Sequence, residues 1–361
     1  MPPGTRVSVF DPARLRIARQ AAMLMKKDLA ERVGVTAGAI SHYEKGTTTP
    51  TVSTLAALAL ALGCPVSFFT ADRPLGEAPH TTAHFRSLRA TTQRERDRAF
   101  AHARLTWELS RTLEQHVRFP DFDLPDYVRD RPADASAAAE AAARFTRAAL
   151  GLGTGPIPNV VRLLESRGVV CTRLPARTRR VFAFSCSFPH RPVVTLSAER
   201  FHRAAGRFDA SHELAHLLLH HDEEPGSHAV ERQAQLFASE FLAPANEISD
   251  SLPRTVDWDQ LLELKLTWGI SMQALLYRAR SLGVLAQPRY RRAVTEINAR
   301  GWRTREPGDD GRAEEPVMLS KALRLIEEGG VNVGDLAREA RLSVETIEMI
   351  VGVDDRPMLL P

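Results

Sequence analysis

The sequence predicts an α+β fold that is mostly helical, and three observations lead to this prediction. Capped, amphipathic segments with helical period occupy the first 70 residues, and similar segments return after residue 207. Between them lie three short runs rich in β-branched and aromatic residues: VVCTRL, RRVFAFSCSF and RPVVTLS. Polar stretches crowded with proline, glycine and aspartate separate these blocks. A small β-sheet is therefore expected among many helices.

Four units are expected within the 361 residues, a length sufficient for two or three domains. They are an N-terminal domain of five short helices (1–74), an arginine-rich helix and linker (75–135), a domain that combines helices with the small sheet (136–305), and a C-terminal helical segment that caps the fold (306–361). The polar stretches RFPDFDLPDYVRDRPADAS and REPGDDGRAEEP mark the borders of the third unit.

The helices of the N-terminal unit are indicated by their end signals. Pro12 follows Asp11, an N-cap candidate, at the start of PARLRIARQAAML. Gly34 interrupts the next segment, Thr36 caps TAGAISHYEKG, and Gly46 ends it. TVSTLAALALALG closes the unit.

Charge is distributed unevenly along the chain. Residues 1–118 hold 17 Lys and Arg against 10 Asp and Glu, whereas the rest of the chain holds 31 against 34. A cationic front end on a near-neutral body indicates an anionic partner at that end. A solvated, arginine-rich surface is the other interpretation, and the charge count alone does not decide between them.

The cysteines and the apolar runs indicate a compartment. Cys64, Cys171 and Cys186 stand at unpatterned spacing, which suits a reducing cytosol and offers no thiolate cluster for a metal. The first residues lack the basic-then-apolar order of a signal peptide. The most apolar run, TLAALALALGCPVSFF, is too short and too rich in alanine to span a bilayer. We therefore expect a cytoplasmic protein with no membrane partner.

The stretch FDASHELAHLLLHH, residues 208–221, has the features of a zinc site. In a helix, positions i and i+4 share a face, so His212 and His216 can reach one metal ion. Zinc binds neutral imidazole nitrogens and, at catalytic sites, keeps one position open for water. Glu213 follows the first histidine, which places its carboxylate beside that water as a base. The spacing therefore predicts Zn²⁺ as the cofactor.

A second amphipathic helix, VERQAQLFASEFLAP, offers the remaining parts of this site. Glu231 lies 15 residues after His216, which is long enough for an antiparallel return that makes this carboxylate the third ligand. Gln235, one turn further along, is expected to orient a ligand imidazole from outside the ligand shell.

Other readings stay open for the remaining histidines and for the helix itself. The leucines between residues 214 and 219 also fit a core helix with incidental histidines, although two buried imidazoles need polar partners. His220, His221 and His228 are candidates for stabilising an oxyanion, and each is more simply explained as structural or solvated.

The segments RFDASHELAHLLLH, VERQAQLFASEFLAP and LKLTWGISMQALLYRARSLG together resemble the ImmA/IrrE family of bacterial zinc metallopeptidase domains, over residues 136–305. The resemblance implies a zincin-like fold in which His212, His216 and Glu231 hold zinc and Glu213 is the catalytic base. It also implies an anti-repressor function, in which a helix-turn-helix repressor is cleaved and genes of mobile elements or of a stress response are switched on.

The front end, KKDLAERVGVTAGAISHYEKGTTTPTVSTLAALALALG, resembles the Xre/Cro-type helix-turn-helix family across residues 12–70. The resemblance implies that TAGAISHYE lies in the major groove of double-stranded operator DNA. Ala37, Gly38 and His42 then face the bases, and Lys26, where the family has glutamine, contacts phosphate. Since Ala37 and Gly38 offer little for recognition, specificity depends on His42, dimer spacing and DNA shape. The residues expected at the DNA surface are Lys26, Lys27, Thr36, Ala37, Gly38, Ala39, Ser41, His42, Lys45 and Thr47.

Two more helical regions are interpreted as interaction elements. The arginine-rich helix within residues 81–118 is expected to help form a homodimer, since helix-turn-helix proteins present two recognition helices to two half-sites. The tail VNVGDLAREARLSVETIEMIVG has an acidic surround, which favours a packing or dimerisation role over DNA contact. For the front end, a small helical protein-interaction module remains the alternative to DNA binding.

Two functions fit these observations. In the first, the protein is a bacterial transcriptional regulator, associated with the nucleoid, whose zinc endopeptidase cleaves a repressor protein or its own linker at residues 119–136. In the second, the zinc domain is a sensor or structural core without catalysis. The complete set of ligands and base favours the peptidase. Ala215 stands where the family has glycine, and this departure, with the fusion of DNA reader to enzyme, favours a latent or gated activity.

Overall fold

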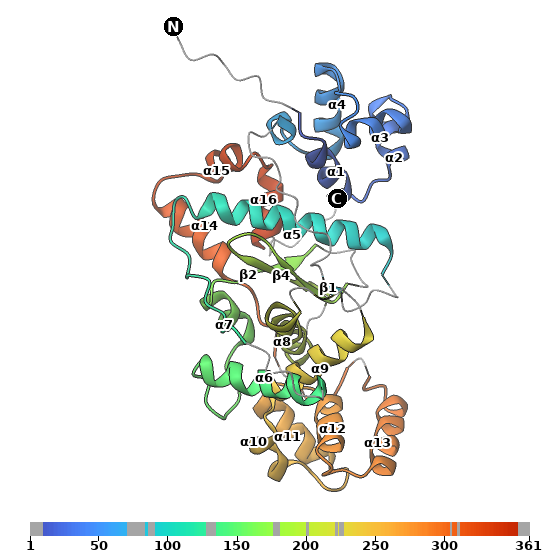
Figure 1. The fold of residues 1–361 in the computed structure, drawn as a ribbon, viewed down its shortest axis with the longest axis vertical. Helices are drawn as coiled ribbons and strands as arrows, with labels where there is room; N and C mark the ends of the chain where they lie inside the picture. The colour runs from blue at the N-terminus through green and yellow to red at the C-terminus, as the bar shows by residue number, and fades with distance from the viewer. Residues whose placement is uncertain are drawn as a thin grey trace.

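The computed structural model describes residues 10–70, 84–85, 91–127, 135–175, 181–199, 202–220, 223, 227–303, 305–308 and 311–352. It confirms the mostly helical α+β fold, with a small sheet among many helices (Figure 1). Within the described ranges, no helix is both long enough and apolar enough to cross a membrane. Parts of the predicted linkers and tail, including residues 75–83, 128–134 and 353–361, lie outside the described residues.

The sheet has four strands in the order β1-β3-β4-β2. The strands are β1 (His84–Phe85), β2 (Val170–Leu174), β3 (Ala183–Ser187) and β4 (Pro192–Ser197). β2 and β4 run parallel, whereas β3 is antiparallel to both β4 and β1. The three longer strands lie in the three runs that the sequence predicted.

The sheet separates two hydrophobic cores, because its side chains alternate between its faces. In β2, Val170 and Leu174 join the core shared with the N-terminal unit, while Cys171 joins the opposite core. In β3, Phe184 and Ala183 divide in the same way. Strands covered on both faces need apolar residues at nearly every position, which explains why these runs read as continuous rather than alternating.

The N-terminal unit agrees with the five predicted helices. It consists of α1 (Pro12–Ala21), α2 (Lys26–Val33), α3 (Ala37–Lys45), α4 (Val52–Leu62) and the 3-10 helix η1 (Val66–Thr70). Asp11 Oδ1 accepts the backbone N–H of Ala13 at 2.9 Å, and Thr36 Oγ1 accepts that of Ala39 at 3.1 Å. Gly46 ends α3 with φ at 71°, and a Cβ there would lie 3.1 Å from a side-chain carbon of α1. Glycine therefore ends this helix without strain.

The helices on the other side of the sheet are α6 (Ala135–Ala149), α7 (Val160–Ser166), α8 (Arg203–Leu219), α9 (His228–Leu242), α10 (Ala245–Ile248), α11 (Trp258–Trp268), α12 (Met272–Ser281) and α13 (Gln287–Ala299), with a 3-10 turn at Ser249–Ser251. Of these, α7 and α8 pack against the strands of the sheet, and the remaining helices lie beyond them (Figure 1). Arg278 of α12 pairs with Glu240 of α9 and, at 3.3 Å, with Glu140 of α6. This buried guanidinium joins α6, α9 and α12.

The long helix α5 (Gln93–Leu113) lies inside the fold rather than in an open linker. It packs against α1, against β2 and β4, and against the C-terminal helices. Arg104 is buried with its guanidinium 5.0 Å from the centre of the Trp107 ring, and Glu108 pairs with Arg14 of α1 at 3.2 Å. The helix therefore buries much of its surface within its own chain, and its role in a homodimer stays a prediction.

The C-terminal helices join both halves of the molecule. They are α14 (Met318–Glu328), α15 (Val333–Ala340) and α16 (Val344–Val351), and all three pack against α5. Glu165 of α7 accepts the backbone N–H groups of Val317 and Met318 at the start of α14, each at 2.9 Å. Arg341 donates to the carbonyl of Thr70 at the end of η1. This segment therefore packs against both the N-terminal unit and α7, and packing was one of the two roles, with dimerisation, that the sequence left open.

A second buried carboxylate fixes the segment before α14. Glu314 accepts the guanidinium of Arg207 at 2.5 Å and the backbone N–H of Val160 at 2.7 Å. Arg207 stands near the start of α8 and also donates to the carbonyl of Ile157 at 2.7 Å. The C-terminal segment is thus bound to α8, the helix that carries the histidines.

Candidate functional site

α8 carries the histidine cluster on a helix that is buried along most of its length. Thirteen of its 17 residues are buried. Its leucines Leu214, Leu217 and Leu218 pack into the core beneath the sheet, while His212 and His216 turn toward α9. One side of the helix is therefore a core surface and the other carries the histidines, so the two interpretations of the sequence apply to different sides. The buried imidazoles have the polar partners that they require.

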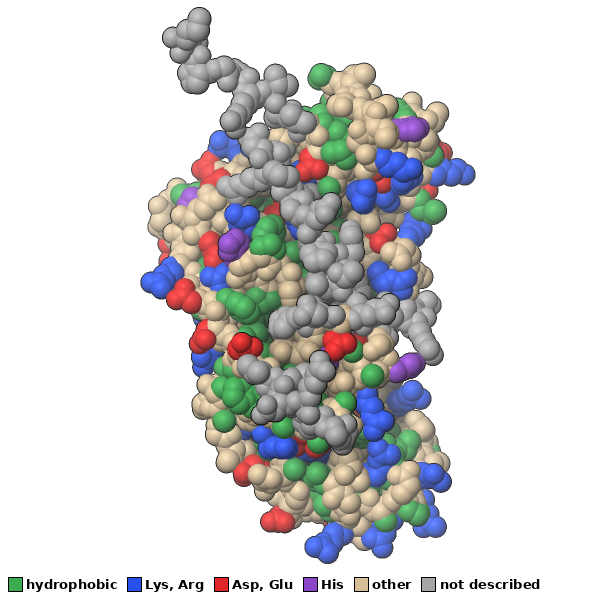
Figure 2. All heavy atoms as spheres, in the orientation of Figure 1, with side chains coloured by type: hydrophobic (Ala, Val, Ile, Leu, Met, Phe, Trp, Pro, Cys, Tyr) green, Lys and Arg blue, Asp and Glu red, His purple; other side chains and the backbone are tan. Residues whose placement is uncertain are grey.

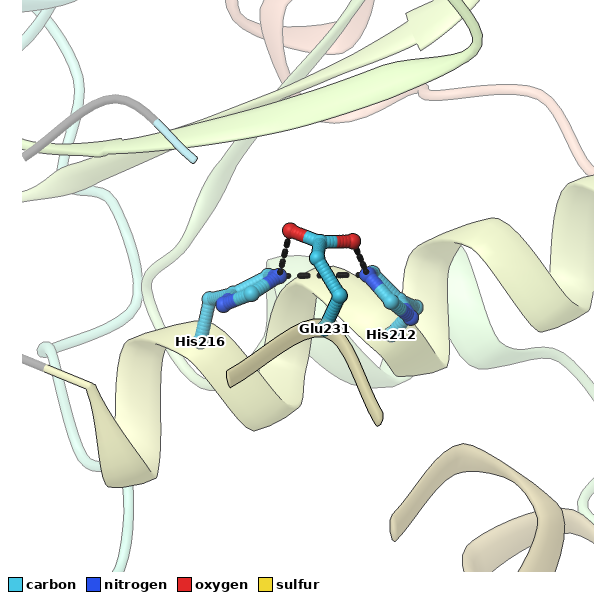
Figure 3. A group of neighbouring side chains, drawn as sticks. All are labelled: His212, His216 and Glu231. Atoms are coloured by element: carbon cyan, nitrogen blue, oxygen red, sulfur yellow. Dashed lines mark hydrogen bonds and ion pairs between the residues drawn. The ribbon is translucent and has the colours of Figure 1, made fainter. Parts of the chain in front are cut away.

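The two histidines and Glu231 bring their polar atoms to one point (Figure 3). The two imidazole Nε2 atoms are 3.1 Å apart, and the Glu231 oxygens lie 3.3 Å from His212 Nε2 and 3.6 Å from His216 Nε2. Zinc bonds of about 2.0–2.1 Å at tetrahedral angles would hold two such ligand atoms roughly 3.3 Å apart. The donor set and its spacing therefore fit a zinc ion.

Glu231 reaches this point from the first turn of α9. Ser227 caps that helix by accepting the N–H of Val230 at 3.2 Å, and α9 packs along α8. Glu231 Oε1 is buried and accepts no hydrogen bond in the described part of the chain. A buried carboxylate oxygen without a donor is costly, and a cation at this position would remove that cost.

Glu213 is completely buried and is positioned from the sheet. The hydroxyl of Ser185 in β3 donates to Glu213 Oε2 at 2.8 Å. The neighbouring thiol of Cys186 stays protonated, because burial and the nearby charge of Glu213 raise its pKa. Sequence reasoning missed Ser185, since nothing in the spacing of the strands indicates which residue faces α8 at this point.

The surroundings of His216 differ from the prediction. Gln235 is exposed, and the structure does not bring it to an imidazole. Instead His220, one turn after His216 on the same helix, places its Nδ1 3.0 Å from His216 Nδ1 and its Nε2 3.2 Å from Gln233 Oε1. The residue that contacts His216 on the side away from its Nε2 is therefore His220, at the end of α8, and not Gln235 on α9.

The other candidates near the site are resolved in part. His228 is exposed at the start of α9, and His221 lies outside the described residues. Ala215 is fully buried in the core beneath the sheet. Its methyl group is therefore accommodated by the packing of α8.

The expected DNA-facing residues lie on α2, α3 and the turn after α3. Seven are exposed: Lys27, Thr36, Ala37, Gly38, His42, Lys45 and Thr47. Figure 2 shows lysine and arginine side chains gathered on the surface over α2 and α3. Ala39 and Ser41 are half-buried, and Ile40 and Glu44 form the buried side of α3.

Lys26 is engaged within the protein. Its Nζ contacts Ser41 Oγ at 3.1 Å and lies 3.5 Å from Glu44 Oε2. Glu44 is buried and also binds Arg19 of α1 at 2.5 Å. The Lys26 side chain thus helps join α2 to α3, and any contact with phosphate would draw it away from Glu44.

His42 is held in place by the turn that follows α3. Its Nδ1 lies 2.9 Å from the hydroxyl of Thr47, which also contacts the carbonyl of His42 at 3.1 Å. The imidazole is exposed and is oriented by this contact. Of the three residues expected to face the bases, it is the one with a polar side chain.

Comparison with known families agrees with both parts of this description. Residues 15–69 match the helix-turn-helix family model, and residues 164–280 match the Peptidase M78 model, described as the IrrE N-terminal-like domain. The two resemblances seen in the sequence are confirmed, with narrower ranges than 12–70 and 136–305. The second match contains all three candidate metal ligands and Glu213. No curated protein matches the chain.

Proposed function

We propose that this chain is a DNA-binding regulator whose ImmA/IrrE-type domain is a zinc-dependent endopeptidase that cleaves a repressor protein. The observation that carries the proposal is the convergence of His212, His216 and Glu231 beside the buried carboxylate of Glu213. Three protein ligands leave a fourth position for water, as catalytic zinc sites require. A structural zinc site would use a fourth protein ligand.

The chemistry divides between the ion and the protein. Zinc in this position supplies Lewis-acid chemistry, lowering the pKa of water and polarising a peptide carbonyl. The carboxylate of Glu213 takes the proton of the attacking water and passes it to the leaving amine. Ser185 holds that carboxylate through one oxygen, so the base is oriented before substrate arrives.

We favour a separate repressor as the substrate, because part of the other candidate, the protein's own linker at residues 119–136, is packed against the rest of the chain. Within residues 119–136, Phe119 is buried, and Asp123 accepts the guanidinium of Arg167 at 3.2 Å and donates its backbone N–H to the carbonyl of the same residue. A zinc cleft must bind its substrate as an extended segment, and this stretch would first have to leave the protein surface. Residues 128–134 lie outside the described residues.

The N-terminal unit is proposed to bind operator DNA through α3, with the protein acting as a homodimer in the cytoplasm at the nucleoid. The exposed lysines and His42 support DNA contact. A dimer would present two α3 helices to two half-sites about one helical turn apart. Much of α5 is buried within the chain, so only its exposed residues are free to take part in the dimer contact. Light scattering of the free protein and of its DNA complex tests this, and a monomer in both states excludes the dimer.

Substitution of the base tests the peptidase directly. Glu213→Gln keeps the size of the side chain but cannot accept the water's proton, so zinc content and fold should be retained while cleavage falls by at least about 100-fold. Zinc-loaded wild type and variant are incubated alone and with candidate repressors, and fragments are mapped by mass spectrometry. Repressor fragments made only by wild type support the proposal. Fragments cut within residues 119–136 would show self-processing. If no fragments form even under inducing stress, the zinc domain is a sensor or a structural domain and not a peptidase.

A further inference from the structure

His220 forms a bridge between a metal-ligand histidine and an amide. It is fully buried at the C-terminal end of α8. Its Nδ1 lies 3.0 Å from His216 Nδ1, and its Nε2 lies 3.2 Å from Gln233 Oε1 of α9. The rings of His216 and His220 stand 5.0 Å apart, centre to centre. A chain of contacts therefore runs from Gln233 on α9 through His220 to Nδ1 of His216.

The direction of each hydrogen bond in this chain follows from the chemistry of its ends. With the Gln233 amide oriented so that Oε1 faces His220, that oxygen can only accept, which requires a hydrogen on His220 Nε2. A neutral imidazole has one N–H, so His220 Nδ1 then carries a lone pair and accepts from His216 Nδ1–H. His216 is thereby left with a lone pair on Nε2. That nitrogen faces His212 and Glu231, where the polar atoms converge.

We propose that His220 and Gln233 are positioning residues that hold His216 in the one tautomer able to bind a metal through Nε2. The opposite tautomer would place an N–H at the centre of the site and exclude the ion. The inference rests on the proposed zinc site, but it does not depend on peptidase activity. It also assigns to His220 and Gln233 the role that the sequence had given to Gln235.

Zinc affinity of the full-length protein, measured by competition with a chelator, tests the first link. His220→Leu removes the acceptor for His216 Nδ1–H and should weaken zinc binding by about 10- to 100-fold. His220→Asn places an amide oxygen near the former Nδ1 and should restore most of the affinity. Thermal unfolding of the zinc-free variants shows whether each one folds. If both folded variants bind zinc as wild type does, the proposal is overturned.

The second link is tested on α9 with a matched control. Gln233→Met keeps the length of the side chain but removes the acceptor, so zinc affinity should fall about 10-fold. Gln233→Glu retains an acceptor at the same position and should bind zinc at least as tightly as wild type. Gln235→Met makes the same change at the exposed residue two positions away and should have no effect. An equal loss in the Gln233→Met and Gln235→Met proteins would contradict the bridge.

The tautomers themselves can be observed. In zinc-loaded protein with ¹⁵N-labelled histidine, NMR should show His220 protonated on Nε2 and His216 protonated on Nδ1. The Gln233→Met protein should lose the single tautomer at His220. A hydrogen on His220 Nδ1 in wild type would overturn the proposal. Failure of wild type to bind zinc at all would instead overturn the proposed zinc site, so the two failures are distinguishable.

Discussion

The candidate metal site and the exposed helix α3, which is proposed to face DNA, are built in opposite ways. At the metal site, His212, His216 and Glu213 are buried, and neighbouring residues set the direction of their polar atoms. On α3, Ala37 and Gly38 are exposed and have no polar side chain to offer. The protein has therefore specified the chemistry of one site almost completely. At α3 the side chains allow only shallow contacts, so in the proposed DNA complex DNA shape and phosphate contacts would carry more of the recognition.

The two sites lie on opposite sides of the sheet, and α5 with the C-terminal helices joins them. α5 contacts α1 on one side and β2 and β4 on the other. The C-terminal segment reaches the end of η1 through Arg341 and the start of α8 through Glu314.

The largest effect is expected from the third ligand. Glu231→Ala leaves two imidazoles to hold the ion, so stoichiometric zinc should be lost, together with the stability that bound zinc adds. Zinc content by mass spectrometry and the melting temperature of the purified protein measure both. The exposed neighbour Arg232 provides the control, since Arg232→Ala should change neither quantity. Full zinc and an unchanged melting temperature in the Glu231→Ala protein would show that this carboxylate is not a ligand.

The second largest effect is expected from the ion pair between Glu314 of the C-terminal segment and Arg207 of α8. Glu314→Ala leaves the guanidinium of Arg207 buried without its carboxylate, which should lower the free energy of unfolding by about 3–5 kcal/mol. Glu315 is exposed and pairs with Arg173, so Glu315→Ala should cost about 1 kcal/mol or less. Urea unfolding of the two variants compares them directly. Similar losses at both positions would contradict the buried ion pair.

A pH dependence is expected from α5, between the two sites. Burial, with a smaller contribution from Arg98, lowers the pKa of His102 to about 4, and its Nε2 lies 3.2 Å from Thr172 Oγ1. The unfolded chain therefore takes up this proton first as pH falls, so stability is complete above about pH 6.5 and is lost toward pH 4.

The variant His102→Gln isolates this contribution, because its amide N–H can still donate to Thr172 but does not titrate. Between pH 7 and pH 4.5 the wild type should lose roughly 2–3 kcal/mol more unfolding free energy than the variant. Urea unfolding at the two pH values measures the difference. Equal losses in the two proteins would mean that His102 is not held neutral by the fold.

The smallest effect is expected on the exposed helix. His42→Ala should reduce discrimination at one operator base pair by about 1 kcal/mol, because a single side-chain contact with a base edge is removed. Lys27→Ala should weaken binding to all sequences alike and reduce its salt dependence, as a phosphate contact does. Binding titrations against operator variants at two salt concentrations separate the two effects. Unchanged discrimination in the His42→Ala protein would show that His42 does not read a base.

Local signals explain what could be predicted from the sequence. The i and i+4 spacing of His212 and His216 depends only on helix geometry, and the caps at Asp11 and Thr36 act within three residues. The position of Glu231 followed from one antiparallel return between two helices. Each of these features is visible within a few turns of chain, and each is present in the structure.

The features that the sequence did not reveal depend on contacts between distant segments. Ser185 reaches Glu213 from a strand 28 residues earlier, and Glu314 accepts Arg207 across 107 residues. The arginines of α5 read as a solvated or dimer-forming surface, yet Arg104 is buried against an aromatic ring. Gln233 and Gln235 are equally plausible by composition. Only the position of His220 at the end of α8 shows that Gln233 is the glutamine that contacts the histidines.

X-ray absorption spectroscopy at the zinc edge of the purified, full-length protein tests the central claim most directly. The account predicts one zinc per chain, with two imidazole nitrogens and oxygen ligands at about 2.0–2.2 Å, and no sulfur in the first shell. The Glu213→Gln protein should give the same spectrum, since that residue is the base and not a ligand. A zinc-free protein, a sulfur ligand at about 2.3 Å, or a spectrum that changes with Glu213→Gln would contradict it.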